Sequence, residues 1–380
     1  MKRIRFGIIG CGLMGREFAV AAARWPHLTE MDVAPEIVAV CDADEALFSW
    51  YADNFASIGQ ATRDYRELLA NPQVEAVYCA VPHNLYEEIY VAVIRAGKHL
   101  MGEKPFGIDR TANAAILASL AAHPAVFARC CSQFPFFPAV QRIARMIEAG
   151  EFGQIIEVEA GFLHSSDLDP GKPLNWKRIV RFNGEYGCMG DLGMHVCHLP
   201  FRAGWIPQNV RAVLSNVVPQ RPDGRGGVEP CETWDNAVLL CETVDSATGA
   251  TFPMTLKTQR IAPGEKNTWY LKVLGTRASA RFSTKNPKRL ELLEYDGGEQ
   301  LWGQIDTGCE TAFAGITGGI FEFGFSDAIL QMWAAWLHEF DRGRSLSRFA
   351  GCATPEETAL SHRLFTAALE SQQKSSVVSI

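Results

Sequence analysis

Lys104 stands in the sequence Gly-Glu-Lys-Pro-Phe-Gly at positions 102–107, directly after a short and mostly apolar run at 98–101. A helical pattern precedes this run, which is typical of a buried parallel strand. Ligands of open α/β sheets bind outside the carboxyl ends of the strands, so a charge pair there would face a crevice. We therefore regard Lys104 as a candidate catalytic residue. The alternative is that Glu103 and Lys104 form an ordinary ion pair on a loop.

A second set of reactive side chains lies at 187–198, which reads Gly-Cys-Met-Gly-Asp-Leu-Gly-Met-His-Val-Cys-His. Asp191 and His195 are four residues apart, so on a helix their side chains share a face and can meet. A carboxylate beside a histidine fixes its tautomer and stabilises its protonated form, which makes the pair a usable proton acceptor. The alternative for His195 is a structural role in a core. A metal site that includes His198 is disfavoured because near neighbours on a helix diverge, so we expect no bound metal.

Composition places the chain among globular proteins with two domains. It has 380 residues, of which 47% are hydrophobic and 21% charged, and a net charge of −7. A chain of this length exceeds the size of a single core, and the acidic balance argues against a nucleic-acid surface. No secretory signal pattern or membrane-spanning run appears, so we expect a cytoplasmic protein without a membrane partner. The 11 cysteines contain no CxxC pair and are typical of reduced, buried thiols.

The N-terminal stretch carries a dinucleotide-binding fingerprint. Gly10-Cys11-Gly12-Leu13-Met14-Gly15 follows an apolar run at 3–9 and precedes a helical pattern. In this context the first glycine permits a tight turn, the second lets backbone approach a pyrophosphate, and the third lets helix pack on strand. The helix N-terminus adds unpaired N–H groups for the phosphates. The candidate cofactor contacts here are Gly10, Gly12, Leu13, Met14 and Gly15.

Asp42 follows the next apolar strand pattern, at 37–41, where the fingerprint's ribose-binding acid belongs. A carboxylate there accepts hydrogen bonds from both ribose hydroxyls and repels a 2′-phosphate. Asp44 adds a second negative charge, and no lysine or arginine follows closely, so NAD is favoured over NADP. The alternative for Asp42 is a helix N-cap.

Asn84 belongs to the sequence Pro82-His83-Asn84, which follows a strand pattern at 74–81 and precedes a helix pattern at 85–96. Asn84 should therefore lie at a strand's carboxyl end, beside the position inferred for Lys104. It either faces a ligand or caps the helix.

The remaining patterns divide the chain into two parts. Helices are predicted at 64–69, 109–121, 138–149, 327–342 and 355–372, the last with Thr354 as N-cap, and strands at 125–130, 155–163, 210–217, 236–242, 251–258, 270–274, 279–282 and 290–295. Gly-rich stretches at 222–227 and 315–319 are predicted loops. We predict an α/β protein with a doubly wound Rossmann domain over residues 1–132. Residues 133–380 should form an α+β domain with a large, mostly antiparallel open sheet for substrate binding and oligomerisation, whose C-terminal helices could pack back on the first domain.

These motifs resemble those of the Gfo/Idh/MocA oxidoreductase family, named for glucose-fructose oxidoreductase and inositol dehydrogenase. The resemblance rests on the fingerprint, Asp42, Pro-x-Asn at 82–84, Glu-Lys-Pro at 103–105 and Gly-Asp-x-Gly-x-His at 190–195. It implies that Lys104 orients the substrate hydroxyl and that Asp191 and His195 form a proton relay. It also implies a homodimer or homotetramer built through the open sheet.

By the same resemblance, further cofactor contacts fall on Pro82, Asn84, Glu103 and Lys104, and on Trp176 and Lys177, which look like the family's tryptophan and basic residue near the nicotinamide. Two departures concern charge: the segment at 133–137 lacks the usual arginine, which puts an anionic substrate in doubt, and His198 replaces a frequent aspartate. Aromatic side chains that could stack on a sugar, or belong to the core, are Phe134, Phe136, Phe137, Trp176 and Tyr186.

The hypothesis from the sequence is an NAD-dependent dehydrogenase acting on a secondary hydroxyl of a sugar, polyol or cyclic alcohol. His195, oriented by Asp191, would take the hydroxyl proton while Lys104 hydrogen-bonds the same oxygen. One alternative is a redox-assisted glycosidase that keeps its NAD, and another is a non-catalytic dinucleotide and sugar sensor.

Overall fold

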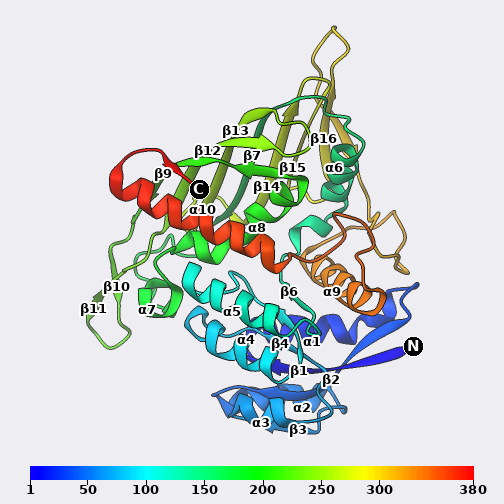
Figure 1. Ribbon diagram of the computed structural model, residues 1–380, viewed down its shortest axis with the longest axis vertical. Coiled ribbons are helices and arrows are strands. Elements are labelled where there is room, and N and C mark those ends of the chain that lie inside the picture. The colour runs from blue at the N-terminus through cyan, green and yellow to red at the C-terminus, as the bar shows by residue number, and fades with distance from the viewer. The chain divides into compact units, whose positions relative to one another are not determined.

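The computed structural model describes residues 1–380, which form two compact units (Figure 1). Unit 1 contains residues 1–136, 311–318 and 324–358, and unit 2 contains residues 137–310, 319–323 and 359–380. The second unit therefore interrupts the first along the chain.

Unit 1 is built on a six-stranded parallel sheet in the order β3-β2-β1-β4-β5-β6. Its strands are β1 (Lys2–Ile9), β2 (Val33–Cys41), β3 (Gln60–Thr62), β4 (Ala76–Cys79), β5 (His99–Gly102) and β6 (Ala128–Cys130), and its helices are α1 (Leu13–Ala23), α2 (Phe48–Asn54), α3 (Tyr65–Ala70), α4 (Tyr86–Arg95), α5 (Arg110–Ala122) and α9 (Phe325–Arg342). The strand order reverses between β1 and β4, which is the switch point where doubly wound sheets bind ligands. The predicted Rossmann fold is confirmed, although β6 is shorter than predicted.

Local sequence signals account for most of these elements. All four residues of β4 are buried, as expected for a parallel strand covered on both faces. Asp64 and Asp109 cap α3 and α5, since their carboxylates accept hydrogen bonds from backbone N–H groups in the first turns.

Helix α9 belongs to unit 1 although it lies far along the chain. Trp333 stacks on Phe18 with ring centroids 3.8 Å apart, and Phe6 contacts Trp333 and Trp336 edge-on. These rings fill the core on one side of the Rossmann sheet, so α9 completes that core.

Unit 2 contains a ten-stranded sheet in the order β17-β16-β15-β14-β7-β13-β12-β9-β18, with β8 paired to β12. Its strands are β7 (Ile155–His164), β8 (Trp205–Pro207), β9 (Asn209–Ser215), β12 (Asn236–Asp245), β13 (Thr251–Gln259), β14 (Lys266–Gly275), β15 (Ala278–Ser283), β16 (Arg289–Glu294), β17 (Gly303–Asp306) and β18 (Val378–Ser379). All pairs are antiparallel except β7 with β13. The predicted, mostly antiparallel sheet is therefore confirmed.

The segments around this sheet are short strands and helices. They are α6 (Pro138–Glu148), α7 (Val180–Asn183), α8 (Cys188–Ala203), α10 (Pro355–Lys374) and the small hairpin of β10 (Gln220–Pro222) and β11 (Val228–Pro230). Helix α8 is buried almost throughout, and the Trp269 indole of β14 donates a hydrogen bond of 2.9 Å to the His195 carbonyl. The sheet thus fixes α8, which carries both Asp191 and His195.

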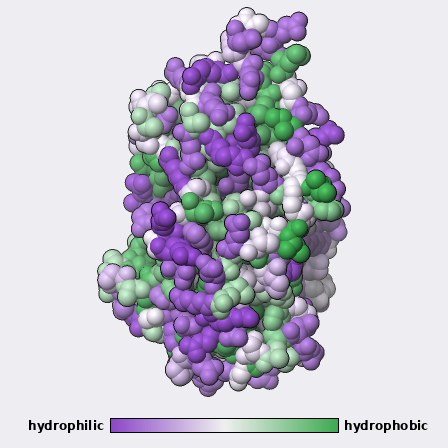
Figure 2. All heavy atoms as spheres, turned by 90° about the vertical axis from the view of Figure 1, so that its right-hand side faces the viewer, coloured by the Kyte–Doolittle hydropathy of each residue, from purple (hydrophilic) through white to green (hydrophobic).

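The surface mixes polar and apolar side chains. Figure 2 shows one face on which hydrophilic residues predominate and apolar residues form small, separate groups. None of the helices is both long and apolar enough to cross a bilayer. All 11 cysteines are free thiols, and every one except Cys309 is buried.

Candidate functional site

The glycine turn of unit 1 leaves room for a ligand on one side only. Gly10 has a φ of +99°, and a Cβ there would lie 2.3 Å from the Ala80 carbonyl oxygen. At Gly15 a Cβ would lie 2.3 Å from the Gly10 carbonyl oxygen, so α1 packs closely on the turn. At Gly12 a Cβ would meet no heavy atom within 4 Å. The backbone is therefore open where a pyrophosphate would approach it.

The start of α1 has donors available for such a group. Gly12 is its N-cap and provides no side-chain cap, and the first turn holds no acidic residue. The Leu13 side chain is 74% exposed, which is unusual for a leucine beside a core. These features suit the phosphates and apolar parts of a dinucleotide.

Asp42 lies beside this turn rather than at a helix start. Its Oδ2 accepts a hydrogen bond of 2.7 Å from the Cys11 N–H, and its Oδ1 accepts one of 2.9 Å from the Asp44 N–H. The N-cap of the following short helix is Asp44, so the N-cap alternative for Asp42 is wrong. Each Asp42 oxygen keeps a lone pair, which suits ribose hydroxyls.

Asn84 and Lys104 follow neighbouring strands, β4 and β5, at the same edge of the sheet. Asn84 lies inside the short helix His83–Leu85, and Leu85 is the N-cap of α4, so the N-cap alternative for Asn84 is wrong. Its Oδ1 is buried without a hydrogen-bond partner. A buried acceptor without a donor costs free energy, so this oxygen suits a ligand donor.

The loop that carries Lys104 is held through its backbone carbonyls. The Tyr90 hydroxyl donates to the Glu103 carbonyl at 3.0 Å, and the Tyr86 hydroxyl to the Lys104 carbonyl at 3.0 Å. Asn113 Nδ2 donates to the Phe106 carbonyl at 2.9 Å. We refer to residues 103–107 as the strand-end loop. Its backbone is fixed by α4 and α5, and the Lys104 side chain is half-buried.

Glu103 is buried, with 5% of its surface exposed. Its Oε1 accepts a hydrogen bond of 2.9 Å from the Tyr78 hydroxyl, and its Oε2 one of 3.3 Å from the Lys104 N–H. Glu103 is therefore a buried acceptor on this loop. Its predicted cofactor contact stays a prediction.

In unit 2, Asp191 and His195 lie one turn apart on α8, and each is 4% exposed. The helix on which their four-residue spacing would place them on one face is therefore present. The His195 ring meets the Phe162 ring edge-on at 5.4 Å, so one side of the imidazole is apolar. Buried polar side chains of this kind are common in functional sites.

Two cations contact the Asp191 carboxylate. Lys177 Nζ lies 3.1 Å from Oδ1 and 3.0 Å from Oδ2. Arg260 Nη2 lies 2.7 Å from Oδ2, and this contact is an ion pair without hydrogen-bond geometry. Two neighbouring cations favour the ionised form of this carboxylate at neutral pH.

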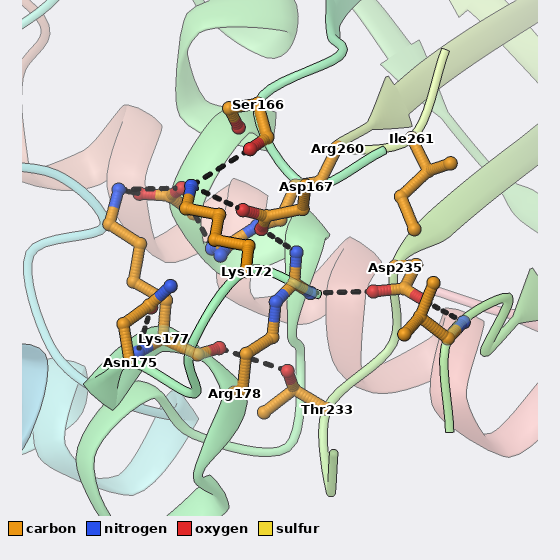
Figure 3. Close-up of polar contacts among 12 residues, drawn as sticks. Ser166, Asp167, Lys172, Asn175, Lys177, Arg178, Thr233, Asp235, Arg260 and Ile261 are labelled. Carbon is orange, nitrogen blue, oxygen red and sulfur yellow. Dashed lines mark hydrogen bonds and ion pairs between the residues drawn. The ribbon is translucent and has the colours of Figure 1, made fainter. Parts of the chain in front are cut away.

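These residues belong to a larger, mostly buried group, which we call the charge cluster: Asp167, Lys172, Lys177, Arg178, Asp191, Arg221, Asp235 and Arg260. Figure 3 shows Arg178 between the carboxylates of Asp167 and Asp235, with 2.7 Å from Arg178 Nη1 to Asp235 Oδ1. Asp235 Oδ2 also accepts hydrogen bonds from the N–H groups of Val217 and Val218. Arg178 and Asp235 have no exposed surface, so they form a fully desolvated pair.

Cations outnumber carboxylates in the charge cluster, and the excess affects their acidity. Burial, and then Arg260, lowers the pKa of Arg178 to about 10, which still leaves it protonated at neutral pH. Burial, Arg221 and Arg260 lower the pKa of Lys172 from its usual value. Arg221 donates to backbone carbonyls, including that of Asp169 at 2.7 Å. The cluster thus cross-links the loops around Asp191.

Two further sequence observations concern polarity and aromatic side chains. Burial, followed by the charge of Arg202, holds the pKa of His198 well below its usual value, so this residue adds no charge at neutral pH.

The candidate aromatic residues other than Trp176 are almost fully buried: Phe134, Phe136, Phe137 and Tyr186. Trp176 is half-buried and adjoins Lys177, whose Nζ lies 5.7 Å from its ring centroid.

Comparison with known families accounts for both units. Residues 4–128 match the model described as the oxidoreductase family with an NAD-binding Rossmann fold, and residues 140–281 match the GFO/IDH/MocA C-terminal domain. The chain belongs to the Gfo/Idh/MocA oxidoreductase family. Its predicted enzyme class, an NAD(P)-dependent oxidoreductase, and its predicted cofactor, NAD, are confirmed at this level.

Relatives within the Gfo/Idh/MocA family include dehydrogenases. Levoglucosan dehydrogenase from Pseudarthrobacter phenanthrenivorans is 27% identical over 311 residues, covering 77% of this chain and 76% of that protein. The mouse (Mus musculus) trans-1,2-dihydrobenzene-1,2-diol dehydrogenase is 27% identical over 192 residues, covering 50% and 54%. The structure of levoglucosan dehydrogenase with NADH and L-sorbose has a TM-score of 0.89 at 23% identity, covering 100% and 99%, and shows that the fold is shared.

Sequence reasoning missed most of the charge cluster. Arg260 lies two residues after the end of the predicted strand at 251–258, so the strand-end rule that singled out Lys104 could have found it. Arg178 adjoins the predicted Lys177. Asp167 and Asp235 carry no local signal, because only the fold brings them to Arg178.

Proposed function

We propose that this protein transfers a hydride between NAD and a secondary hydroxyl of a sugar, polyol or cyclic alcohol, with Lys104, Asp191 and His195 as its acid–base residues. Both relatives named above are dehydrogenases, and the name of one gives levoglucosan as its substrate. The observation that carries the proposal is Asp191, a buried carboxylate held by two cations one helical turn from the buried His195.

A bound nicotinamide supplies the hydride acceptor or donor. The protein's task is then to move a proton and to stabilise the charge that develops on the substrate oxygen. We assign proton uptake to a ring nitrogen of His195, its orientation to Asp191, and stabilisation of the oxygen to the Lys104 ammonium. Proposed cofactor contacts are Gly10, Gly12, Leu13, Met14, Gly15, Asp42, Pro82, Asn84, Glu103, Lys104, Trp176 and Lys177.

The test is the absorbance of the reduced nicotinamide at about 340 nm. It is measured on the purified protein mixed with NAD or NADP and a panel of substrates. The panel contains levoglucosan, L-sorbose, inositols, other sugars and glycosides. NADH formation with one class of alcohols would support the proposal and identify that class.

Two other outcomes would overturn the dehydrogenase assignment. NAD recovered with the protein, with glycoside cleavage but no net NADH, would indicate the redox-assisted glycosidase. Binding of NAD and a sugar without turnover of any compound would indicate a sensor.

The cytoplasmic location and the assembly through the unit 2 sheet stay predictions. We expect a homodimer or homotetramer in analytical ultracentrifugation. A monomer at micromolar concentration would contradict this.

A further inference from the structure

We propose that Arg260 is a positioning residue of this enzyme, which holds the Asp191 carboxylate in one orientation and so acts on the reaction through it. The inference rests on the proposed function, since it assumes that Asp191 serves the chemistry. Neither the sequence motifs nor the family resemblance assigns a role to Arg260.

The backbone around Arg260 is fixed on both sides. Its N–H donates to the Asp235 carbonyl at 3.0 Å. The neighbouring Ile261 exchanges two hydrogen bonds with the Asn236 side chain, at 2.9 and 3.1 Å. The end of β13 is thereby attached to the start of β12, and Asp235 is itself anchored by Arg178. The guanidinium of Arg260 therefore approaches α8 from a rigid support.

Burial makes this contact stronger than the one from Lys177. The side chains of Arg260 and Asp191 are 3% and 6% exposed, whereas that of Lys177 is 38% exposed. Solvent screens the lysine, while the arginine and the carboxylate interact in a medium of lower dielectric constant. Of these two cations, Arg260 is thus the stronger electrostatic partner of Asp191.

A carboxylate fixed between two cations is a poor proton acceptor. Asp191 therefore remains an anion that orients the imidazole or a substrate hydroxyl, and His195 carries the proton. This refines the proton relay expected from the resemblance, in which Asp191 and His195 shared the transfer.

The test is a double-mutant cycle with Arg260→Met and Asp191→Asn, measured as kcat and KM for the substrate found in the panel. Alone, Arg260→Met should lower kcat about 10- to 100-fold with little change in KM, because Asp191 without its buried cation samples unproductive orientations. In the Asp191→Asn background the same change should cost less than about 3-fold, because its target is gone. An equal loss in both backgrounds would overturn the proposal.

Two further variants separate positioning from general damage. Arg260→Lys should recover most of kcat, since the contact depends on charge and not on a directed hydrogen bond. Arg221→Met is the matched control, because Arg221 is equally buried but donates to backbone carbonyls and not to Asp191. Arg221→Met should change kcat by the same factor in the wild-type and in the Asp191→Asn background. No recovery in Arg260→Lys would contradict the inference.

A second cycle needs no substrate. It compares the thermal unfolding of the wild type, Arg260→Met, Asp191→Asn and the double variant. The Tm of the double variant should be higher than the value obtained by adding the Tm shifts of the two single variants. The reason is that each single change takes a buried partner from a charge that remains. Additive shifts would overturn the Arg260 inference even if the enzyme is active. Coupled shifts without turnover of any substrate would instead overturn the proposed function.

Discussion

The strand-end loop of unit 1 and the charge cluster of unit 2 hold candidate site residues by opposite means. In the loop, neutral hydroxyl and amide donors from α4 and α5 fix backbone carbonyls. In the cluster, the side chains are themselves the scaffold, and Asp191 is held by Lys177 and Arg260.

This difference predicts how each region responds to change. Neutral hydrogen bonds each contribute a modest free energy, so the strand-end loop should tolerate the loss of one donor. A buried ion pair is costly to break, because the remaining partner stays charged and desolvated. The charge cluster should therefore be the more fragile of the two.

The largest effect is expected from Asp235→Ala in the charge cluster. The change leaves fully buried Arg178 with one carboxylate fewer and removes the acceptor of the Val217 and Val218 N–H groups. We expect a loss of about 3–5 kcal/mol in the free energy of unfolding, measured by urea titration.

The matched control is Glu291→Ala, which breaks the partly exposed Arg281–Glu291 pair of β15 and β16. It should cost less than about 1 kcal/mol. Equal losses in the free energy of unfolding for Glu291→Ala and Asp235→Ala would contradict the claim that buried ion pairs are costlier to break than exposed ones.

In unit 1, the variant Gly12→Ala should weaken NAD binding without lowering the stability of the fold. Gly12→Ala adds a Cβ that meets no atom within 4 Å, so the Tm should not change. The same methyl occupies the open side of the turn, and calorimetry should show NAD affinity at least about 10-fold weaker. Gly10→Ala, with φ of +99° and a contact of 2.3 Å, should instead lower the Tm. Unchanged NAD affinity in Gly12→Ala would contradict the proposed cofactor site.

The third prediction concerns the pH dependence of stability in unit 2. Burial lowers the pKa of His198 in the folded protein, with Arg202 adding to the effect, whereas the unfolded chain binds a proton near pH 6.5. Between the folded pKa and about 6.5 the unfolded state thus binds more protons, so stability falls as the pH falls through this window. The slope is about 1.4 kcal/mol per pH unit. In urea titrations His198→Gln should flatten it, and an unchanged slope would rule out this histidine as the cause.

A smaller effect than that of Asp235→Ala is expected from Tyr90→Phe in the strand-end loop. It removes the donor to the Glu103 carbonyl and leaves the ring in place. The free energy of unfolding should fall by about 1–2 kcal/mol in the same urea assay. A loss as large as that of Asp235→Ala would contradict the contrast between the two regions.

The same contrast explains what could be predicted from the sequence. The glycine turn, the N-cap Thr354 and the helices predicted to begin at Asp64 and Asp109 have local signals, and the structure places them there, with Asp64 and Asp109 as N-caps. Each depends on residues close to it in the sequence. The strand-end loop was located for the same reason, because a buried strand ends there.

The charge cluster depends on pairs that only the fold defines. Arg178 and Asp235 are separated by 57 positions, and no periodicity relates Arg260 to Asp191. The parallel pairing of β7 with β13 was missed for the same reason, since strand patterns do not specify partners. Strand β17 and the hairpin of β10 and β11 are too short and too exposed to show a strand pattern.

The most direct test of the central claim is turnover of Lys104→Met beside Lys98→Met, with NAD binding measured on both. Lys98 is the matched control, because its Nζ bonds to the carbonyls of Asn71 and Val74 in the same unit. We predict that Lys104→Met loses about 10²- to 10⁴-fold in kcat, and that Lys98→Met keeps its turnover. The NAD affinity of Lys104→Met should change far less than its kcat, because Lys104 is one of many proposed cofactor contacts. Wild-type turnover in Lys104→Met would contradict the account.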